Sequence, residues 1–299
     1  MTLISRRDAG KLVGKLLVGS SAAMFVGCEA LAGSERINSV IRGVQIGSQS
    51  YSFRDRPLAA AIEGFRTVGL GECELAQMHL EPPKVSREEL RQWRLQVPLS
   101  RFHQVRKQFE DAGILLYGYN YSFRNDFTDT EMERGFQMAE ALGAKCITAS
   151  GTVSVAPRVD KYAKKYRMKV GFHGHDKTSD PDEFSTPETF ARAMHGASEY
   201  IAVNLDIGHF TAAGGDPVAY IRQNHERIVT LHIKDRKKNH GPNMPFGQGD
   251  TPIAEVLREL RDNRWRIPAN IEYEYGQPGM DTMEEMKKCY AYCRSALEA

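Results

Sequence analysis

Short apolar runs alternate with longer amphipathic stretches eight times between residue 41 and the end of the chain. The runs are five to seven residues long and rich in Val, Ile, Leu and aromatic side chains, which is typical of buried strands. They predict strands at residues 41–47, 71–75, 114–119, 144–149, 168–173, 200–206, 228–233 and 268–273. Such regular alternation is the pattern of repeated βα units, whose strands form a parallel sheet.

The stretches between the strands carry the period and the end signals of helices. They predict helices at residues 58–67, 87–112 with a break at Pro98, 129–142, 156–166, 188–195, 253–263 and 281–297, and one that opens at Pro217. Residues 176–187 and 238–250 read as polar loops. Eight units in about 260 residues are what a closed (β/α)8 barrel, the TIM-barrel fold, requires. A doubly wound open sheet is the structural alternative.

Residues 1–32 differ from the remainder of the chain. Arg6 and Arg7 precede an apolar run at 12–27 that is too short and too rich in small residues to span a membrane. The segment resembles a twin-arginine export signal, so we expect export to the periplasm, with cleavage before Gly33 and a single barrel domain at 33–299. Cys28 ends a loose lipobox, and a lipid anchor there is the alternative to cleavage.

The net charge and the cysteine pattern argue against some classes of function. The leader holds four of the 40 basic and two of the 38 acidic residues, so 36 of each remain and the net charge is zero. Such a chain has no electrostatic footprint for nucleic acid or for an anionic membrane surface. The five cysteines include no Cys-x-x-Cys pair, and those after the leader read as ordinary buried thiols.

Four of the predicted strands end in side chains that bind metals. Barrel enzymes keep their chemistry at the C-terminal ends of the strands. One such His or Glu alone is more often a hydrogen-bonded surface group, but four in one ring of strands indicate a shared site. The strand ends offer His173 and His175, Asp206, His232, and Glu272 and Glu274.

Residue types and spacing restrict that site further. His173 and His175 are two residues apart, as are Glu272 and Glu274, so each pair points to the same side of its strand and only one member needs to be a ligand. Two imidazoles and two carboxylates suit a divalent first-row ion. We expect Mn²⁺, with Co²⁺ or Zn²⁺ compatible and Mg²⁺ less so because of the nitrogen ligands.

Four motifs resemble those of the xylose-isomerase-like sugar isomerases and epimerases, which share their barrel with the endonuclease IV family. The motifs are QIGSQSYSFRD, LDIGHF, LHIKDR and NIEYEYG. The resemblance implies that the metal ligands are His173, Asp206, His232 and Glu272. It also implies that His209 contacts the substrate and takes part in catalysis. Substrate contacts are expected from His175, Lys234, Asp235 and Lys238.

One position departs from the epimerase pattern. Many sugar epimerases of the group carry a Glu where this chain has His173, and they use two metal-bound carboxylates as the acid/base pair. Here Glu272 alone remains of that pair, and we expect it to be the base. Glu74 ends the second strand and is a candidate second acid/base group. The aromatic residues near the first and third strand ends could line the sugar site or belong to the core: Tyr51, Phe53, Tyr119 and Tyr121.

The sequence therefore predicts a divalent-metal-dependent sugar isomerase or epimerase that acts on a small carbohydrate by proton transfer next to a carbonyl. A lyase or hydratase acting on keto-sugars or 3-keto-glycosides is the first alternative, because the same metal and base can run an elimination. A sugar-binding barrel without catalysis is the second. The fold also permits an abasic-site nuclease, but the neutral charge, the leader and the lack of a His on the third strand argue against it.

Overall fold

The structure is a computed structural model that describes residues 35–276 and 279–299. Its central strands are β2 (Val44–Gln49), β3 (Glu72–Ala76), β4 (Leu115–Asn120), β5 (Cys146–Ala149), β6 (Lys169–His173), β7 (Ile201–Asp206), β8 (Ile228–Ile233) and β11 (Ala269–Ile271). All eight predicted strands are present, with ends shifted by at most three residues. The expected leader, its cleavage site and the lipobox at Cys28 lie outside the described residues, so export stays a prediction.

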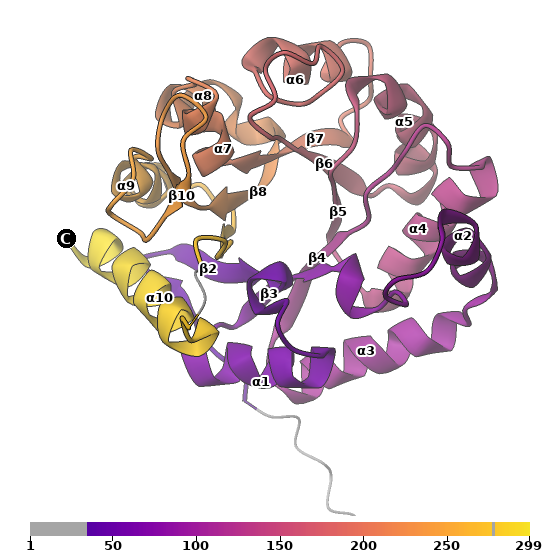
Figure 1. The fold of residues 1–299 in the computed structure, drawn as a ribbon, viewed down its shortest axis with the longest axis horizontal. Coiled ribbons are helices and arrows are strands. Elements are labelled where there is room, and N and C mark those ends of the chain that lie inside the picture. Colours follow the sequence, from indigo (N-terminus) through magenta and orange to yellow (C-terminus); the bar gives the residue numbers. More distant parts are fainter. Residues whose placement is uncertain (1–34, 277–278) are drawn as a thin grey trace, which may run out of the picture. The chain divides into compact units, whose positions relative to one another are not determined.

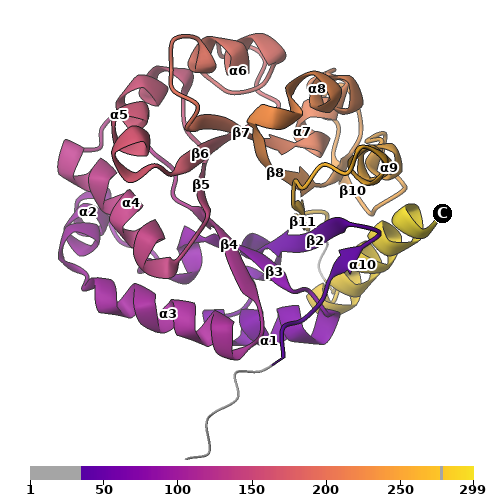
Figure 2. The ribbon, with the colours of Figure 1, turned by 180° about the vertical axis from the view of Figure 1, so that it is seen from behind.

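The eight strands close into a parallel barrel. Each strand pairs with the next one along the chain, β11 pairs in parallel with both β8 and β2, and the pairing of β2 with β3 completes the ring. Figures 1 and 2 show this ring from its two ends, with the helices around it. The closed barrel is confirmed, because each of the eight strands has two neighbours. An open sheet is excluded, because it would have two edge strands with only one neighbour each.

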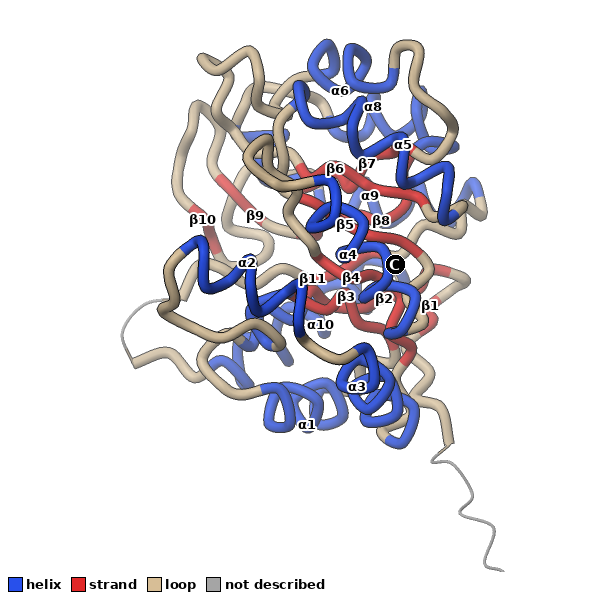
Figure 3. The backbone as a smooth tube through the Cα atoms, turned by 90° about the vertical axis from the view of Figure 1, so that its right-hand side faces the viewer, coloured by secondary structure: helices blue, strands red, loops and turns tan. Residues whose placement is uncertain are grey.

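Helices cover the outside of the barrel (Figure 3). The helices of the layer are α1 (Leu58–Val68), α2 (Arg87–Gln96), α3 (Leu99–Asp111), α4 (Asp129–Leu142), α5 (Ala156–Tyr166), α6 (Pro187–Met194), α8 (Pro217–Asn224), α9 (Ile253–Asn263) and α10 (Thr282–Glu298). Local signals set their ends: Ser86 and Glu89 form a capping box on α2, and Gly143 ends α4 in the left-handed conformation. Pro98 separates α2 from α3 as expected.

The structure differs from the sequence prediction at three places. The first predicted strand contains a hairpin, because β1 (Val40–Ile41) turns back onto β2 at Arg42 and Gly43. The loop predicted at 238–250 contains part of a second hairpin, in which β9 (Asp235–Arg236) pairs with β10 (Asn243–Met244). A short helix, α7 (Ile207–Ala212), follows β7 and was not predicted. Its first turn is capped by Asp206, whose Oδ1 accepts from the backbone N–H of His209 at 2.7 Å.

The apolar core fills the layer between strands and helices, whereas the barrel interior is partly polar. Glu72 lies inside the barrel with no exposed surface, and burial raises the pKa of its carboxyl well above the usual value, as does nearby Glu74. Phe53, Tyr119 and Tyr121 are buried in the core. Cys73, Cys146, Cys289 and Cys293 are buried free thiols, as predicted. Among the described helices, none combines the length and the apolar character needed to cross a membrane.

Candidate metal centre and active site

Four neighbouring strands bring the predicted ligands together at one end of the barrel. His173 is the last residue of β6, Asp206 is the last residue of β7, His232 lies near the end of β8, and Glu272 directly follows β11. Asp206 and His232 are direct register partners in adjacent parallel strands. One ligand atom from each of the four residues lies within 4.8 Å of all the others. All four side chains are buried.

The spacing of the atoms fits a first-row ion. His173 Nε2 lies 3.4 Å from Asp206 Oδ2 and 4.0 Å from Glu272 Oε2, and His232 Nδ1 lies 3.1 Å from Glu272 Oε2. Ligands that are 2.0–2.2 Å from a tetrahedral ion are about 3.4 Å apart. Each of these four atoms is also buried without a hydrogen-bond partner, which is costly unless something else binds it. The donor set and its unpartnered atoms therefore fit a divalent metal.

The two histidines are prepared for this role in different ways. Burial lowers the pKa of His173 to about 3, so its imidazole is neutral at pH 7 and free to coordinate. Burial also acts to lower the pKa of His232, but Glu74 and Glu272 on either side raise it well above the usual value. A metal bound at Nδ1 of His232 would take the place of a proton on that nitrogen.

Glu74 orients His232 rather than lining the pocket. Its Oε2 accepts from Nε2 of His232 at 2.9 Å, and its Oε1 accepts from the Thr148 hydroxyl at 2.7 Å. A carboxylate that holds one ring nitrogen of a ligating histidine fixes which nitrogen faces the metal. Glu74 is fully buried and does not line the pocket, so this position favours a positioning role over the second acid/base role expected from the sequence.

The effect of Glu74 on the metal is testable. In Glu74→Gln, the negative charge that holds the His232 proton on Nε2 is lost, and we expect metal affinity to fall about 10- to 100-fold. Competition with a chromophoric chelator measures this. Glu183→Gln is the matched control, because Glu183 pairs with His175 Nδ1 at 3.0 Å in the same way but His175 is not one of the four ligands. Equal metal affinity in Glu74→Gln and wild type would show that Glu74 does not position His232 for metal binding.

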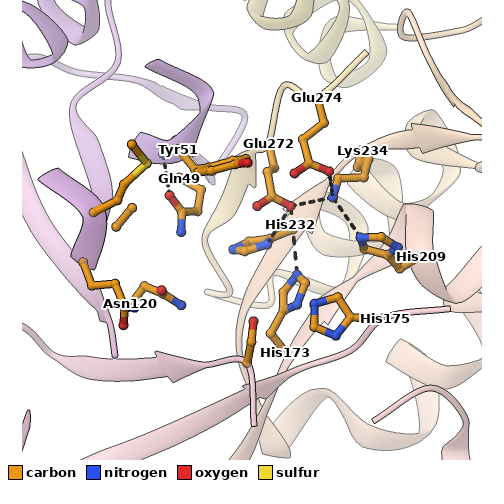
Figure 4. A pocket seen from close by; sticks show the side chains of 14 residues that line it. Gln49, Tyr51, Asn120, His173, His175, His209, His232, Lys234, Glu272 and Glu274 are labelled. Atoms are coloured by element: carbon orange, nitrogen blue, oxygen red, sulfur yellow. Dashed lines mark hydrogen bonds and ion pairs between the residues drawn. The ribbon is translucent and has the colours of Figure 1, made fainter. Parts of the chain in front are cut away.

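A buried ammonium group lies beside the carboxylate ligands (Figure 4). Lys234 Nζ is 2.9 Å from Asp206 Oδ2, 2.7 Å from Glu272 Oε2 and 2.6 Å from Glu274 Oε2. The two ligand oxygens are at ion-pair distance from it but not in hydrogen-bond geometry. Burial acts to lower the pKa of Lys234, but the three carboxylates raise it above the usual value, so the side chain stays charged.

His209 links this ammonium group to the pocket wall. Its Nε2 lies 3.1 Å from Lys234 Nζ, and its Nδ1 lies 3.5 Å from Asp176 Oδ1 and 2.6 Å from Arg236 Nη1. Lys234 and Arg236 can only donate hydrogen bonds and the Asp176 carboxylate can only accept them, so the ring of His209 lies between two cations and one carboxylate. Hydrogen bonds from His209 and Arg236 hold the pKa of Asp176 well below its usual value, so it is ionised there.

Three of the four ligands and Lys234 line a cavity of about 460 Å³, which we call the metal pocket. Its charged side carries His173, His232, Lys234, Glu272, Glu274, His175 and His209. Figure 4 shows Gln49, Tyr51 and Asn120 facing them from the opposite side, which we call the neutral wall. Ala76, Gln77, Met78 and Ser150 also line the cavity. One side of the cavity is therefore charged and the other is neutral.

Two predicted substrate residues lie elsewhere. The carboxylate of Asp235 is buried and accepts from the backbone N–H groups of Gly247, Gly249 and Thr251, so it holds the loop after β10 in place. Lys238 is exposed between β9 and β10. Neither lines the metal pocket, and a substrate contact for them stays a prediction. His175, Lys234 and His209 do line it.

Tyr51 lines the metal pocket, as the sequence allowed, but the other residues of the neutral wall were not predicted although a signal for them existed. Gln49 and Asn120 are the last residues of β2 and β4, and Ser150 directly follows β5. They occupy the same strand-end positions as the ligands on the other half of the barrel. Their side chains are neutral, so a prediction based on ionisable residues does not include them.

Comparisons with known proteins agree with the barrel. A family model described as "Xylose isomerase-like TIM barrel" matches residues 59–293. No curated protein matches the chain significantly. Among solved structures, 3-keto-D-glucoside 4-epimerase from E. coli is 12% identical with a TM-score of 0.62, covering 84% of this chain and 99% of that chain.

Two further solved structures resemble the chain. The probable 3-DHS dehydratase AsbF from Bacillus anthracis is 17% identical with a TM-score of 0.60, covering 82% of this chain and 98% of that one. The IOLI protein with a bound zinc atom is 15% identical with a TM-score of 0.64, covering 85% and 98%. At these identities the likeness shows the fold alone.

Proposed function

Because the chain belongs to the xylose isomerase-like TIM barrel family, and because its strand ends gather four buried candidate ligands, we propose that it is a divalent-metal-dependent sugar isomerase or epimerase. The substrate is a keto-sugar, and the reaction moves a proton on the carbon next to its carbonyl. The observation that carries the proposal is the set of four buried ligand atoms without a hydrogen-bond partner, and three of their residues, His173, His232 and Glu272, line the metal pocket. The zinc-bound relative supports a divalent ion without identifying it.

His173, Asp206, His232 and Glu272 would hold the ion, which when bound polarises the sugar carbonyl and acidifies the neighbouring C–H. Glu272 is the base in this scheme, since it lines the pocket beside that carbonyl. Burial acts to raise the pKa of Glu272, but Lys234 and His232 lower it well below the usual value, so the carboxylate is ionised at neutral pH. An ionised base within reach of the substrate is the minimum that proton abstraction requires.

Lys234 and the neutral wall supply the remaining contacts to the substrate. The Lys234 ammonium group, 2.7 Å from Glu272 Oε2, is positioned to stabilise negative charge that develops on a substrate oxygen. Its burial makes that interaction stronger than it would be in water. The amides of Gln49 and Asn120 are positioned to bind sugar hydroxyls and fix which carbon faces Glu272.

A lyase or hydratase is the second candidate, and His173 is the observation that favours it. Epimerisation returns a proton to the opposite face of the carbon, and His173 stands where the second carboxylate of the epimerases is expected. Elimination needs one base on the carbon and an acid for the leaving group. A structural relative carries the name of a dehydratase, which supports this candidate at the level of the fold.

His173→Glu separates the two candidates. It restores a carboxylate facing Glu272, so we expect the ratio of epimerised to eliminated product to rise in this variant when metal is supplied in excess. Products formed from a keto-hexose are counted by NMR. If the wild-type protein already epimerises efficiently and His173→Glu is slower, His173 belongs to an isomerase site and the lyase candidate is wrong.

A further inference from the structure

A second cavity of about 720 Å³ lies beside the metal pocket. We call it the side groove. It is lined by the segments that follow β3, β4, β5 and β6 and by one face of α2. Gln77, Ser150 and His175 line both cavities, so they form the boundary between them. A ligand bound at the metal therefore has a second space directly next to it.

The side groove offers unused hydrogen-bond donors. Arg124 is exposed there and has no side-chain partner among the described residues. Arg87 binds Asp126 through Nε and Glu131 through Nη2, but its Nη1 is buried without a partner. An atom without accessible surface is out of reach of a ligand in the groove, so the free donors that the groove presents are those of Arg124.

The groove also carries acceptors and an apolar edge. Asp126 and Glu183 lie among its cations, so a phosphate group would meet negative charge there. Only four large hydrophobic side chains of the described residues are exposed, and two of them border these cavities. Met78, which is 42% exposed, lines the metal pocket, and Val85, which is 38% exposed, lines the side groove. Donors, acceptors and an apolar edge together match a pyranose or furanose ring.

We propose that the side groove is a second sugar subsite and that the substrate is a glycoside. The reacting keto-sugar lies over the metal, and the second sugar lies in the groove with its hydroxyls on Arg124. This rests on the function proposed above and adds the substrate class. The metal pocket alone has the size of a small-ligand site, so a single sugar would leave the groove unused.

The test compares two probes with the same reacting ring: methyl 3-keto-α-D-glucopyranoside and 3-ketosucrose. Hydrogen exchange with D₂O is followed by mass spectrometry in the presence of Mn²⁺. We expect wild type to prefer the disaccharide by about tenfold in kcat/KM, and Arg124→Ala to remove about that factor for the disaccharide while leaving the methyl glycoside within about twofold. Arg266→Ala is the control, since Arg266 is also exposed and unpartnered but lines neither cavity.

Equal kcat/KM for both probes, or an equal loss on both in Arg124→Ala, would overturn the second subsite while leaving the proposed function intact. If neither probe exchanges hydrogen, the proposed function fails and the groove is tested by binding alone. Saturation-transfer NMR with sucrose should then show contact to both rings in wild type and loss of the fructosyl signal in Arg124→Ala. Absence of contact to the second ring in wild type would overturn the groove as a sugar site.

Discussion

Asp206→Ala should empty the metal centre. Asp206 Oδ2 is a buried charged ligand without a hydrogen-bond partner, and its removal leaves three ligands and one negative charge fewer. Loss of an outer partner of a ligand already costs about 10- to 100-fold in affinity, so loss of the ligand itself should cost at least the upper end of that range. Elemental analysis of the purified protein measures the metal content per chain.

Asp206 has a second role that needs its own control. Its Oδ1 caps α7, so Asp206→Ala removes a helix cap as well as a ligand. Asp216→Ala removes the equivalent cap from α8, where Oδ1 of Asp216 accepts from the backbone N–H of Ala219, and it should keep the metal. Unchanged metal content in Asp206→Ala would disprove the site, whereas loss in both variants would point to a folding defect.

Glu272→Gln should abolish exchange of substrate hydrogen with solvent while the barrel stays folded. Glu272 is the carboxylate that lines the pocket, borders the metal and is ionised at neutral pH. Removal of a positioned base typically costs about 10²- to 10⁴-fold in rate. Because Glu272 is also a ligand, metal is added to saturation before rates are compared.

Glu272→Asp is the matched variant for this prediction. It keeps a carboxylate and the negative charge on the metal but withdraws the base by one methylene. We expect it to hold metal nearly as well as wild type and to exchange hydrogen at a rate between those of wild type and Glu272→Gln. Full exchange activity in metal-saturated Glu272→Gln would mean that another group takes the proton, with Glu274 as the next carboxylate in the pocket.

The strands and the strand ends that carry the candidate ligands were predictable for one shared physical reason, whereas the choice of His173 over His175 and of Glu272 over Glu274 came from the family resemblance. Parallel strands must be buried on both faces, so they read as continuous apolar runs, and a charged residue at the end of such a run marks the mouth of the barrel. Asp206 and His232 stand out in this way. The place of Lys234 follows from the same rule, because it lies two residues beyond His232 and so points to the same side.

Other features depend on contacts that no local pattern encodes. The six residues of α7 are too few for a helical period, and the helix exists because Asp206 caps it and β9 packs against it. The family resemblance implied a substrate contact for Asp235, but its carboxylate binds backbone groups 12 to 16 residues later in the chain. The side groove is likewise assembled from five separate segments.

The central claim is that this chain uses a bound divalent metal to move a proton next to a sugar carbonyl. The most direct measurement incubates the metal-loaded wild-type protein with keto-sugars in D₂O and follows deuterium at the carbon next to the carbonyl. The account predicts that deuterium enters that carbon, that a chelator stops the exchange and that added metal restores it. The claim is contradicted if exchange continues undiminished after complete removal of the metal. It is also contradicted if the protein with one ion bound per chain exchanges hydrogen on no keto-sugar.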